Sequence, residues 1–199
     1  MTHYFENDSS LKSAKKDLTL VKNSEKYVFT TDIGVFSNKS FDHGSTLLLN
    51  EVMKHYKEGD ILDLGSGYGY IGIVLARTYT HAHVTMVDIN ERAVLLTKIN
   101  IAQNNVKNAT ALVSDGYKAL VNKKFSYIVI NPPIKAGKKV YYPFFKDAKN
   151  YLTQDGTLMF VMKKKHGAKS AAKYVLEQFG NCTLLKKDAG YYLYTAISN

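Results

Sequence analysis

The feature that most constrains the fold is a regular alternation of short apolar segments with longer amphipathic ones. Five segments have the length and apolar content of buried strands, at 61–64, 83–88, 109–113, 125–130 and 156–162. Apolar residues recur at helical spacing between and around them, at 42–56, 70–77, 90–103, 139–152 and 167–179. Strands that alternate with helices in this way predict βαβ units and a mostly parallel sheet.

The two ends of the chain depart from this rhythm. Segments 182–187 and 191–197 are joined by the tight turn Asp188-Ala-Gly190, which leaves no room for a helix and predicts an antiparallel hairpin. We therefore expect an α/β protein with a seven-stranded, mostly parallel sheet that a C-terminal hairpin closes. This arrangement is typical of Rossmann-like methyltransferases rather than dehydrogenases. Residues 1–40 are expected to form a short appendage, with one or two short strands at 27–31 and 34–37, on a domain of residues 41–199.

The strongest local motif is the glycine-rich loop Ile61-Leu-Asp-Leu-Gly-Ser-Gly-Tyr-Gly-Tyr-Ile-Gly72. Glycines 65, 67 and 69 follow a buried strand, where they let the backbone turn sharply and approach a ligand closely. The spacing Gly67-x-Gly69-x-x-Gly72 also matches the dinucleotide fingerprint, a match that is weak by itself. We predict that Gly65, Ser66, Gly67 and Gly69 contact a cofactor.

An acidic residue stands at the end of each of three successive predicted strands. Asp63 would repel a pyrophosphate but suits a ligand with a sulfonium and an ammonium group, and Asp88 can accept both hydroxyls of a ribose. Asp115 can accept an adenine amino group. Each acid alone is explained equally well as a helix cap or turn residue, whereas three together favour a cofactor site at this edge of the sheet. Ile89 and Gly116 are expected beside them.

The fourth strand ends in the tetrapeptide Asn131-Pro132-Pro133-Ile134. Two prolines could simply form a stiff turn. However, prolines have no N–H, so the stretch presents acceptors and few competing donors. The side-chain oxygen of Asn131 and the carbonyl of Pro132 can together accept two hydrogen bonds from one planar NH2 group and aim its lone pair at a methyl donor. Pro133 and Ile134 are expected to pack on the substrate. This pattern predicts amine methylation in which positioning replaces a strong base.

The positive charge of the chain lies in its second half. Residues 1–117 contain 12 Lys and Arg against 13 Asp and Glu, whereas residues 118–199 contain 15 lysines against four acidic residues. Blocks of like charge are often only solvated surface, but a one-sided excess of this size favours a nucleic-acid partner. The candidate contacts are Lys135, Lys138, Lys163, Lys164 and Lys165.

The remaining composition favours a cytoplasmic protein without a metal. No apolar run approaches the ~18 residues that span a bilayer, and the opening sequence MTHYFENDSS does not resemble a secretory signal. Cys182 is the single cysteine, which excludes an internal disulfide and a cysteine metal cluster.

Four stretches give the chain a family resemblance. They are 31–37 with 42–45, the loop 63–69, the extended motif Asn131-Pro-Pro-Ile-Lys-Ala-Gly-Lys138, and 164–168 leading to 179–181. The chain resembles the single-domain form of the 16S ribosomal RNA guanine-N2 methyltransferases, the family of ribosomal RNA small subunit methyltransferase C. The resemblance implies S-adenosylmethionine as cofactor, ribosomal RNA or the small-subunit particle as partner, and a monomer or weak dimer. It also implies that Phe36 and Ser37 lie near the methionine end of the cofactor. Ile134 departs from the aromatic residue that many members of the broader class have there.

Three alternatives fit parts of the pattern. Methylation of a release-factor glutamine at N5 shares the Asn-Pro-Pro motif, but that site usually has an aromatic after the prolines. Methylation of adenine N6 in DNA typically requires a separate recognition domain, for which the chain leaves little room. A non-catalytic RNA-binding module would have no reason to keep Asp63, the glycines and Asn131 together.

Overall fold

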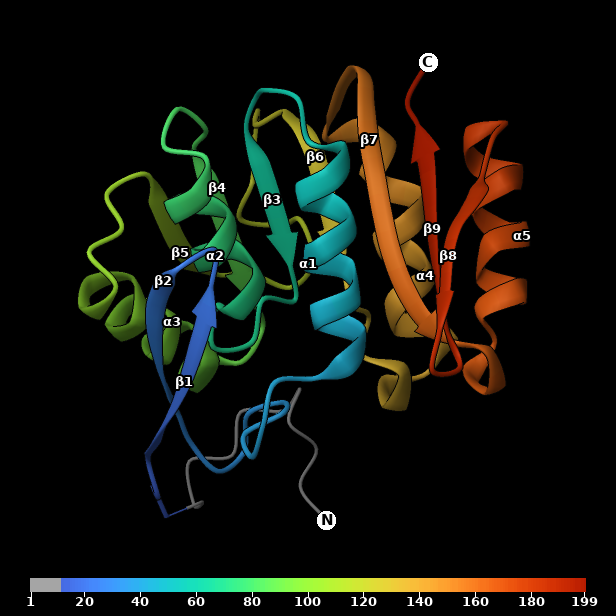
Figure 1. The fold of residues 1–199 in the computed structure, drawn as a ribbon. Helices are drawn as coiled ribbons and strands as arrows, with labels where there is room; N and C mark the ends of the chain where they lie inside the picture. The colour runs from blue at the N-terminus through green and yellow to red at the C-terminus, as the bar shows by residue number, and fades with distance from the viewer. Residues whose placement is uncertain (1–11) are drawn as a thin grey trace.

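A computed structural model describes residues 12–199 and contains a seven-stranded sheet with helices on both faces, together with a two-stranded hairpin (Figure 1). The strands are β1 (Lys16–Lys22), β2 (Glu25–Thr31), β3 (Ile61–Leu64), β4 (Val84–Asp88), β5 (Ala109–Val113), β6 (Phe125–Ile130), β7 (Leu152–Lys163), β8 (Thr183–Asp188) and β9 (Tyr191–Ile197). The helices are α1 (His43–His55), α2 (Tyr70–Thr78), α3 (Glu91–Gln103), α4 (Lys138–Asp147) and α5 (Ala168–Phe179).

The strands of the large sheet lie in the order β5-β4-β3-β6-β7-β9-β8. Neighbours from β5 to β7 are parallel, while β9 runs antiparallel to both β7 and β8. The parallel sheet with a C-terminal hairpin is therefore confirmed. Because β3 lies between β4 and β6, the ends of the strands that carry Asp63, Asp88 and Asn131 are neighbours.

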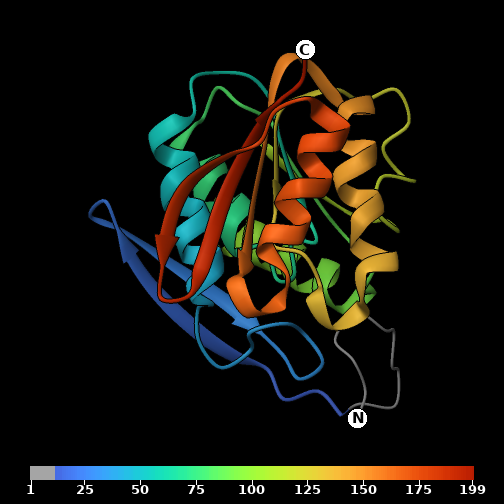
Figure 2. The same ribbon diagram turned by 90° about the vertical axis from the view of Figure 1, so that its right-hand side faces the viewer.

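Helices cover the two faces of the sheet unequally. Strand residues alternate between the faces, so that Ile61 packs with α1, α2 and α3, whereas Leu62 packs on the other face with α4 and α5. Figure 2 shows α4 and α5 side by side on that second face. None of the helices within residues 12–199 is long and apolar enough to cross a membrane.

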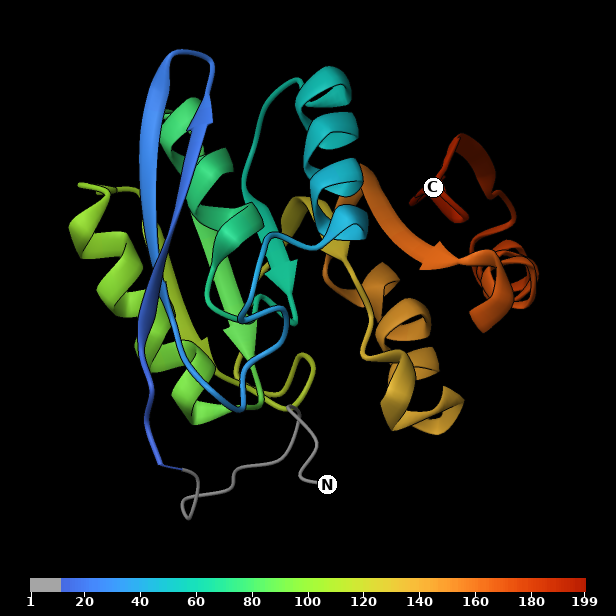
Figure 3. The ribbon, with the colours of Figure 1, turned by 60° about the horizontal axis from the view of Figure 1, so that its bottom comes forward.

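The N-terminal hairpin of β1 and β2 lies beside α3 (Figure 3). Two asparagines one helical turn apart hold it there. The amide of Asn100 accepts from Thr30 N at 2.7 Å and donates to Thr30 O at 2.9 Å and to Tyr68 O at 2.8 Å. The amide of Asn104 forms the same pair of bonds with Val28, at 3.0 and 2.7 Å. Side chains of α3 thus take the place of a neighbouring strand along β2.

The structure departs from the sequence-based expectations at the N-terminus. The predicted strand at 27–31 is confirmed as part of β2, but β1 lies in a stretch for which no strand was predicted. The strand expected at 34–37 is not formed, because this stretch folds as turns with left-handed φ angles of 84° at Gly34 and 56° at Ser37. The part of the predicted appendage at 1–11, including the opening sequence, lies outside the described residues.

The segment between β6 and β8 also differs at its boundaries. The helix predicted at 139–152 ends at Asp147 and is followed by a 3₁₀ turn, Ala148–Asn150. The strand predicted to begin at residue 156 begins at Leu152 instead, and its pairing with β6 contains a register shift. The left-handed φ of 59° at Asp155 lies at this irregularity, which the apolar pattern does not reveal.

We expect Asn100→Ala to destabilise the protein strongly. Asn100 is fully buried, and its removal leaves Thr30 N, Thr30 O and Tyr68 O without their partner. Each buried polar group left unpaired costs about 1–3 kcal/mol. Urea unfolding measures the loss, with Lys98→Ala on the exposed side of the same helix as the control. A free energy of unfolding within about 0.5 kcal/mol of the wild type, the usual range for neutral surface substitutions, would contradict this role.

Candidate active site

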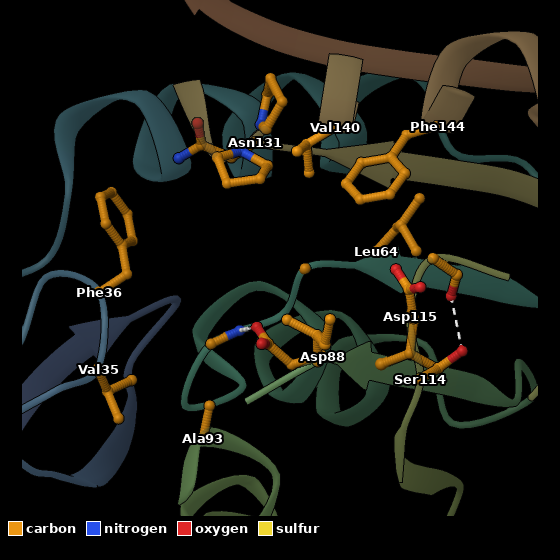
Figure 4. A pocket seen from close by; sticks show the side chains of 17 residues that line it. Val35, Phe36, Leu64, Asp88, Ala93, Ser114, Asp115, Asn131, Val140 and Phe144 are labelled. Atoms are coloured by element: carbon orange, nitrogen blue, oxygen red, sulfur yellow. Dashed lines mark hydrogen bonds between the residues drawn. The ribbon is translucent and has the colours of Figure 1, made fainter. Parts of the chain in front are cut away.

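A pocket of about 270 Å³ opens at the carboxyl ends of β3, β4, β5 and β6. Figure 4 shows Asp88, Ala93 and Ser114 on one side of it, Asn131, Val140 and Phe144 on the opposite side, and Phe36 at one end. Many of the predicted site residues line it, namely Phe36, Gly65, Gly67, Asp88, Ile89, Asp115, Gly116, Asn131, Pro132 and Pro133. This pocket therefore lies at the edge of the sheet that the strand-end acids predicted.

A smaller hollow adjoins this pocket. Phe36, Gly65, Gly67 and Asn131 line both cavities, and the smaller one adds the predicted residues Asp63 and Ser66 together with Ser37, Asp42 and Ser45. Asn131 and Phe36 thus stand at the junction between the two cavities.

The glycine loop holds Asp88 in place. Gly67 has a φ angle of 58°, a left-handed conformation that favours glycine, and its N–H donates to Asp88 Oδ2 at 2.8 Å. Asn90 N donates to the other oxygen at 2.9 Å. Burial raises the pKa of Asp88, and these backbone donors offset part of that effect. The carboxylate is thus fixed at the pocket that it lines.

Asp63 is the most deeply buried acid of the site. Its side chain is 3% exposed, and its Oδ2 accepts from Gly72 N at 2.9 Å. Burial raises the pKa of Asp63 to about 7, the Gly72 N–H lowers it, and the charge of Asp88 raises it further. An acid in this condition is stabilised as a carboxylate by any cation that enters the smaller hollow.

The amide of Asn131 is oriented by the first turn of α1. Its Nδ2 donates to Asp42 Oδ2 at 3.0 Å and to Ser45 Oγ at 2.8 Å, which uses both of its hydrogens. Asp42 is also the N-cap of α1, since it accepts from Ser45 N at 2.8 Å, as the predicted helix start at residue 42 implies. Among the described residues no donor reaches Asn131 Oδ1, so this oxygen remains an acceptor.

The two prolines form a tight turn. Pro133 has φ −74° and ψ 78°, an inverse γ-turn, and Pro132 O accepts from Ile134 N at 2.9 Å. The Pro132 carbonyl retains its second lone pair. The tetrapeptide is therefore both the stiff turn and the row of acceptors that the sequence allowed as alternatives.

Some predicted residues lie outside both cavities. Gly69 is the N-cap of α2, where a side chain would meet Thr97 Cγ2 at 2.8 Å. Ile134 packs partly buried against the α4–α5 side of the core. The predicted lysines lie on the surface: Lys135 and Lys138 follow the tetrapeptide, Lys163 ends β7, and Lys164 and Lys165 form the next turn.

Sequence reasoning missed several lining residues. Val35 precedes Phe36, and Val140 and Phe144 come from the first two turns of α4. The sequence signal for the latter pair is their spacing of four, which places both on one face of a helix that follows the tetrapeptide. No group of three His, Cys, Asp or Glu side chains in residues 12–199 is placed to hold a metal ion.

Comparisons with known proteins identify related chains. The family described as methyltransferase small domain matches residues 26–195. The uncharacterized protein YbxB of Bacillus subtilis is 38% identical over 195 residues, which cover 98% of this chain and 97% of that protein. Ribosomal RNA small subunit methyltransferase C of Aliivibrio fischeri is 34% identical over 170 residues, 82% of this chain and 47% of the relative.

A solved structure supports the same relationship. The T. thermophilus 16S rRNA N2 G1207 methyltransferase, in complex with AdoMet and guanosine, matches with a TM-score of 0.83 and 29% identity over 95% of this chain and 52% of that one. The chain thus spans about half the length of the RNA methyltransferases that it matches.

The raised pKa of Asp63 predicts a pH-dependent stability. Between about pH 4 and 7 the folded protein keeps a proton that the unfolded chain has released, so the free energy of unfolding should fall as the pH rises through this window. The loss is at most about 4 kcal/mol, at 1.36 kcal/mol per unit. Urea unfolding of the ligand-free protein at several pH values measures it. In Asp63→Asn this component should vanish, and an identical pH profile for both proteins would refute the assignment.

Proposed function

The chain is an S-adenosylmethionine-dependent methyltransferase of the methyltransferase small domain family, and we propose that it methylates the exocyclic N2 amine of a guanine in 16S ribosomal RNA. The proposed target is a site of the type that the T. thermophilus relative is named for, guanine 1207. The observation that carries the proposal is the oriented carbonyl oxygen of Asn131 at the junction between the two cavities.

The residues of the two cavities fit the parts of the cofactor. Asp88 is proposed to accept the ribose hydroxyls. Asp115 and Gly116 are proposed to contact the adenine, which would lie between Val140 and Ala93 in the larger pocket. Asp63 is proposed to face the ammonium and sulfonium groups from the smaller hollow, since no cationic side chain of residues 12–199 pairs with its buried carboxylate. Gly65, Ser66, Gly67, Ile89 and Phe36 complete the proposed contacts.

The tetrapeptide is proposed to orient the acceptor amine. S-adenosylmethionine, when bound, supplies a methyl group on a sulfonium and leaves as neutral S-adenosylhomocysteine. Asn131 Oδ1 and the second lone pair of Pro132 O accept one hydrogen bond each from the guanine NH2, which fixes the direction of its weakly nucleophilic lone pair. Pro133 and Ile134 are proposed to contact the base. No side chain has to act as a strong base, because the amine proton passes to water after transfer.

The basic half of the chain is proposed to hold the RNA. Lys163 lies three residues beyond Phe160, the partner of Ile130 at the end of β6, so it belongs to the same edge of the sheet as the tetrapeptide. Lys164, Lys165 and Lys135 lie in exposed 3₁₀ turns near that edge, and the exposed Lys138 begins α4. Contacts between these lysines and phosphates would supply affinity without sequence preference, which leaves the choice of base to the pocket.

Methylation of ribosomal particles tests the proposed function. Purified protein and labelled S-adenosylmethionine are incubated with small subunits from a strain that lacks the gene, with large subunits, and with a release factor. The expected product is N2-methylguanine in 16S RNA alone. Large subunits are a necessary arm, because ribosomal RNA large subunit methyltransferase G of Photobacterium profundum is also 30% identical over 169 residues. Label in 23S RNA or in the release factor, with none in 16S RNA, would refute the acceptor.

We expect Asn131→Ala to separate chemistry from binding. Removal of the oriented oxygen should lower the rate of methyl transfer by about 10²–10³, because the interaction matters mostly in the transition state. Cofactor affinity, measured by calorimetry, should stay within a few-fold, since Asp63, Asp88 and the glycine loop remain. A near-wild-type rate would show that the tetrapeptide is only a turn. Collapse of cofactor binding would place Asn131 in the cofactor site instead.

Replacement of Lys163, Lys164 and Lys165 by alanine should weaken RNA binding and flatten its salt dependence. For every lysine–phosphate pair that the substitutions remove, the slope of log affinity against log salt should become shallower by about 0.7–0.9. Filter binding of ribosomal RNA at several salt concentrations measures the slope. The matched control is the triple substitution of Lys12, Lys15 and Lys16, which removes the same charge from the N-terminal segment. Equal slopes for the two variants would contradict a specific role for the 163–165 run.

A further inference from the structure

Asp42 and Ser45 have contacts that capping a helix does not require. An N-cap needs one side-chain oxygen for the first free N–H groups, and Asp42 Oδ2 serves Ser45 N in this way. The same oxygen also accepts from Asn131 Nδ2, and Oδ1 accepts from the hydroxyl of Tyr191 at 3.3 Å. Ser45 Oγ takes the second hydrogen of Asn131 Nδ2.

These contacts decide which way round the amide of Asn131 lies. A carboxylate has only acceptor atoms, so Asp42 must face the NH2 group of the amide and never its oxygen. If the amide were rotated by 180°, Asn131 Oδ1 would meet Asp42 Oδ2, two acceptors with no proton between them, and NH2 would take the place of the acceptor. A group that donates, such as an amine, would then meet a donor.

We infer that Asp42 and Ser45 are positioning residues that lock Asn131 with its carbonyl oxygen toward the amine to be methylated. The inference rests on the proposed function of Asn131 and assigns a cause to its orientation. The two residues act through Asn131 and need not touch the substrate. Asp42 is the N-cap of α1 and Ser45 lies in its first turn; the packing of α1 on β7 and β9 places the helix start beside the end of β6.

Asp42→Ser separates positioning from capping. Serine is as good an N-cap as aspartate, so α1 should stay folded. Its side chain is one bond shorter and its hydroxyl is engaged with Ser45 N, so it cannot reach Asn131. The double variant also carries Ser45→Ala, which keeps the backbone N–H of residue 45. In this variant both Nδ2 hydrogens of Asn131 lose their acceptors. We expect the double variant to lose roughly ten- to a hundred-fold in kcat, with the thermal midpoint little changed.

Asp42→Asn is the rescue variant. One carbonyl oxygen can accept from both Ser45 N and Asn131 Nδ2, as Asp42 Oδ2 does, while the new NH2 faces the Tyr191 hydroxyl. Turnover should recover to within a few-fold of the wild type. Asp60→Ser is the matched control, because Asp60 also accepts from a backbone N–H, that of His83, but lies at the opposite end of β3.

A second readout does not depend on the acceptor. In the full-length protein with S-adenosylmethionine, NMR follows solvent exchange of the two Asn131 side-chain amide protons. They should exchange roughly ten-fold faster in the double variant than in the wild type, and Asp42→Asn should restore their protection. Unchanged exchange of the amide protons overturns the inference. An unchanged kcat in the double variant also overturns it, provided that the wild-type protein is active in the same assay. Failure to methylate 16S RNA alone would refute the proposed acceptor and leave the NMR result standing.

Discussion

The close approach of α2 to β3 and β4 is the contact on which the site depends. Gly72 has no side chain, and a Cβ there would lie 2.4 Å from Met86 Cγ. Helix α2 therefore begins directly over β3, where the Gly72 N–H reaches the buried carboxylate of Asp63. The intervening loop must then turn back through left-handed backbone, and this turn brings Gly67 N to Asp88 on the next strand. One packing contact thus fixes two acids that a cofactor would use.

The segment before α1 is part of the same site. It supplies Phe36 and Val35 to the pocket, although it belongs to neither β2 nor α1. Its path is set by α3: the amide of Asn90 donates to Gly34 O at 3.0 Å, and Arg92 donates to Ile33 O at 2.9 Å. Because α3 also pairs with β2 through its asparagine amides, the hairpin and the pocket wall share one anchor. The predicted boundary at residue 40 therefore divides residues that line one pocket.

Much of the fold could be predicted from the sequence, because it rests on local periodicity. All seven strands of the sheet were predicted by their apolar runs. The three strand-end acids lie together because the carboxyl ends of adjacent parallel strands meet at one edge of the sheet. β1 was missed because its Leu18 and Leu20 stand among charged residues on a half-exposed hairpin, a weak signal. The packing of Gly69 was not foreseen for a different reason: a glycine that packs against Thr97 looks the same in sequence as one that meets a ligand.

By itself the sequence determined the class of fold, the edge of the sheet that carries the site, and the residue types available for amine chemistry. These follow from the spacing of apolar residues, from glycines and from strand-end acids, all of which are properties of neighbouring residues. Only the tertiary structure decided how those residues are aimed. The partners that orient Asn131 lie 89 and 86 residues away along the chain, and Phe36, from the segment before α1, lines the same pocket as Phe144 of α4. No local pattern encodes such pairs, because they form only when the packing of helices on a sheet brings distant segments together.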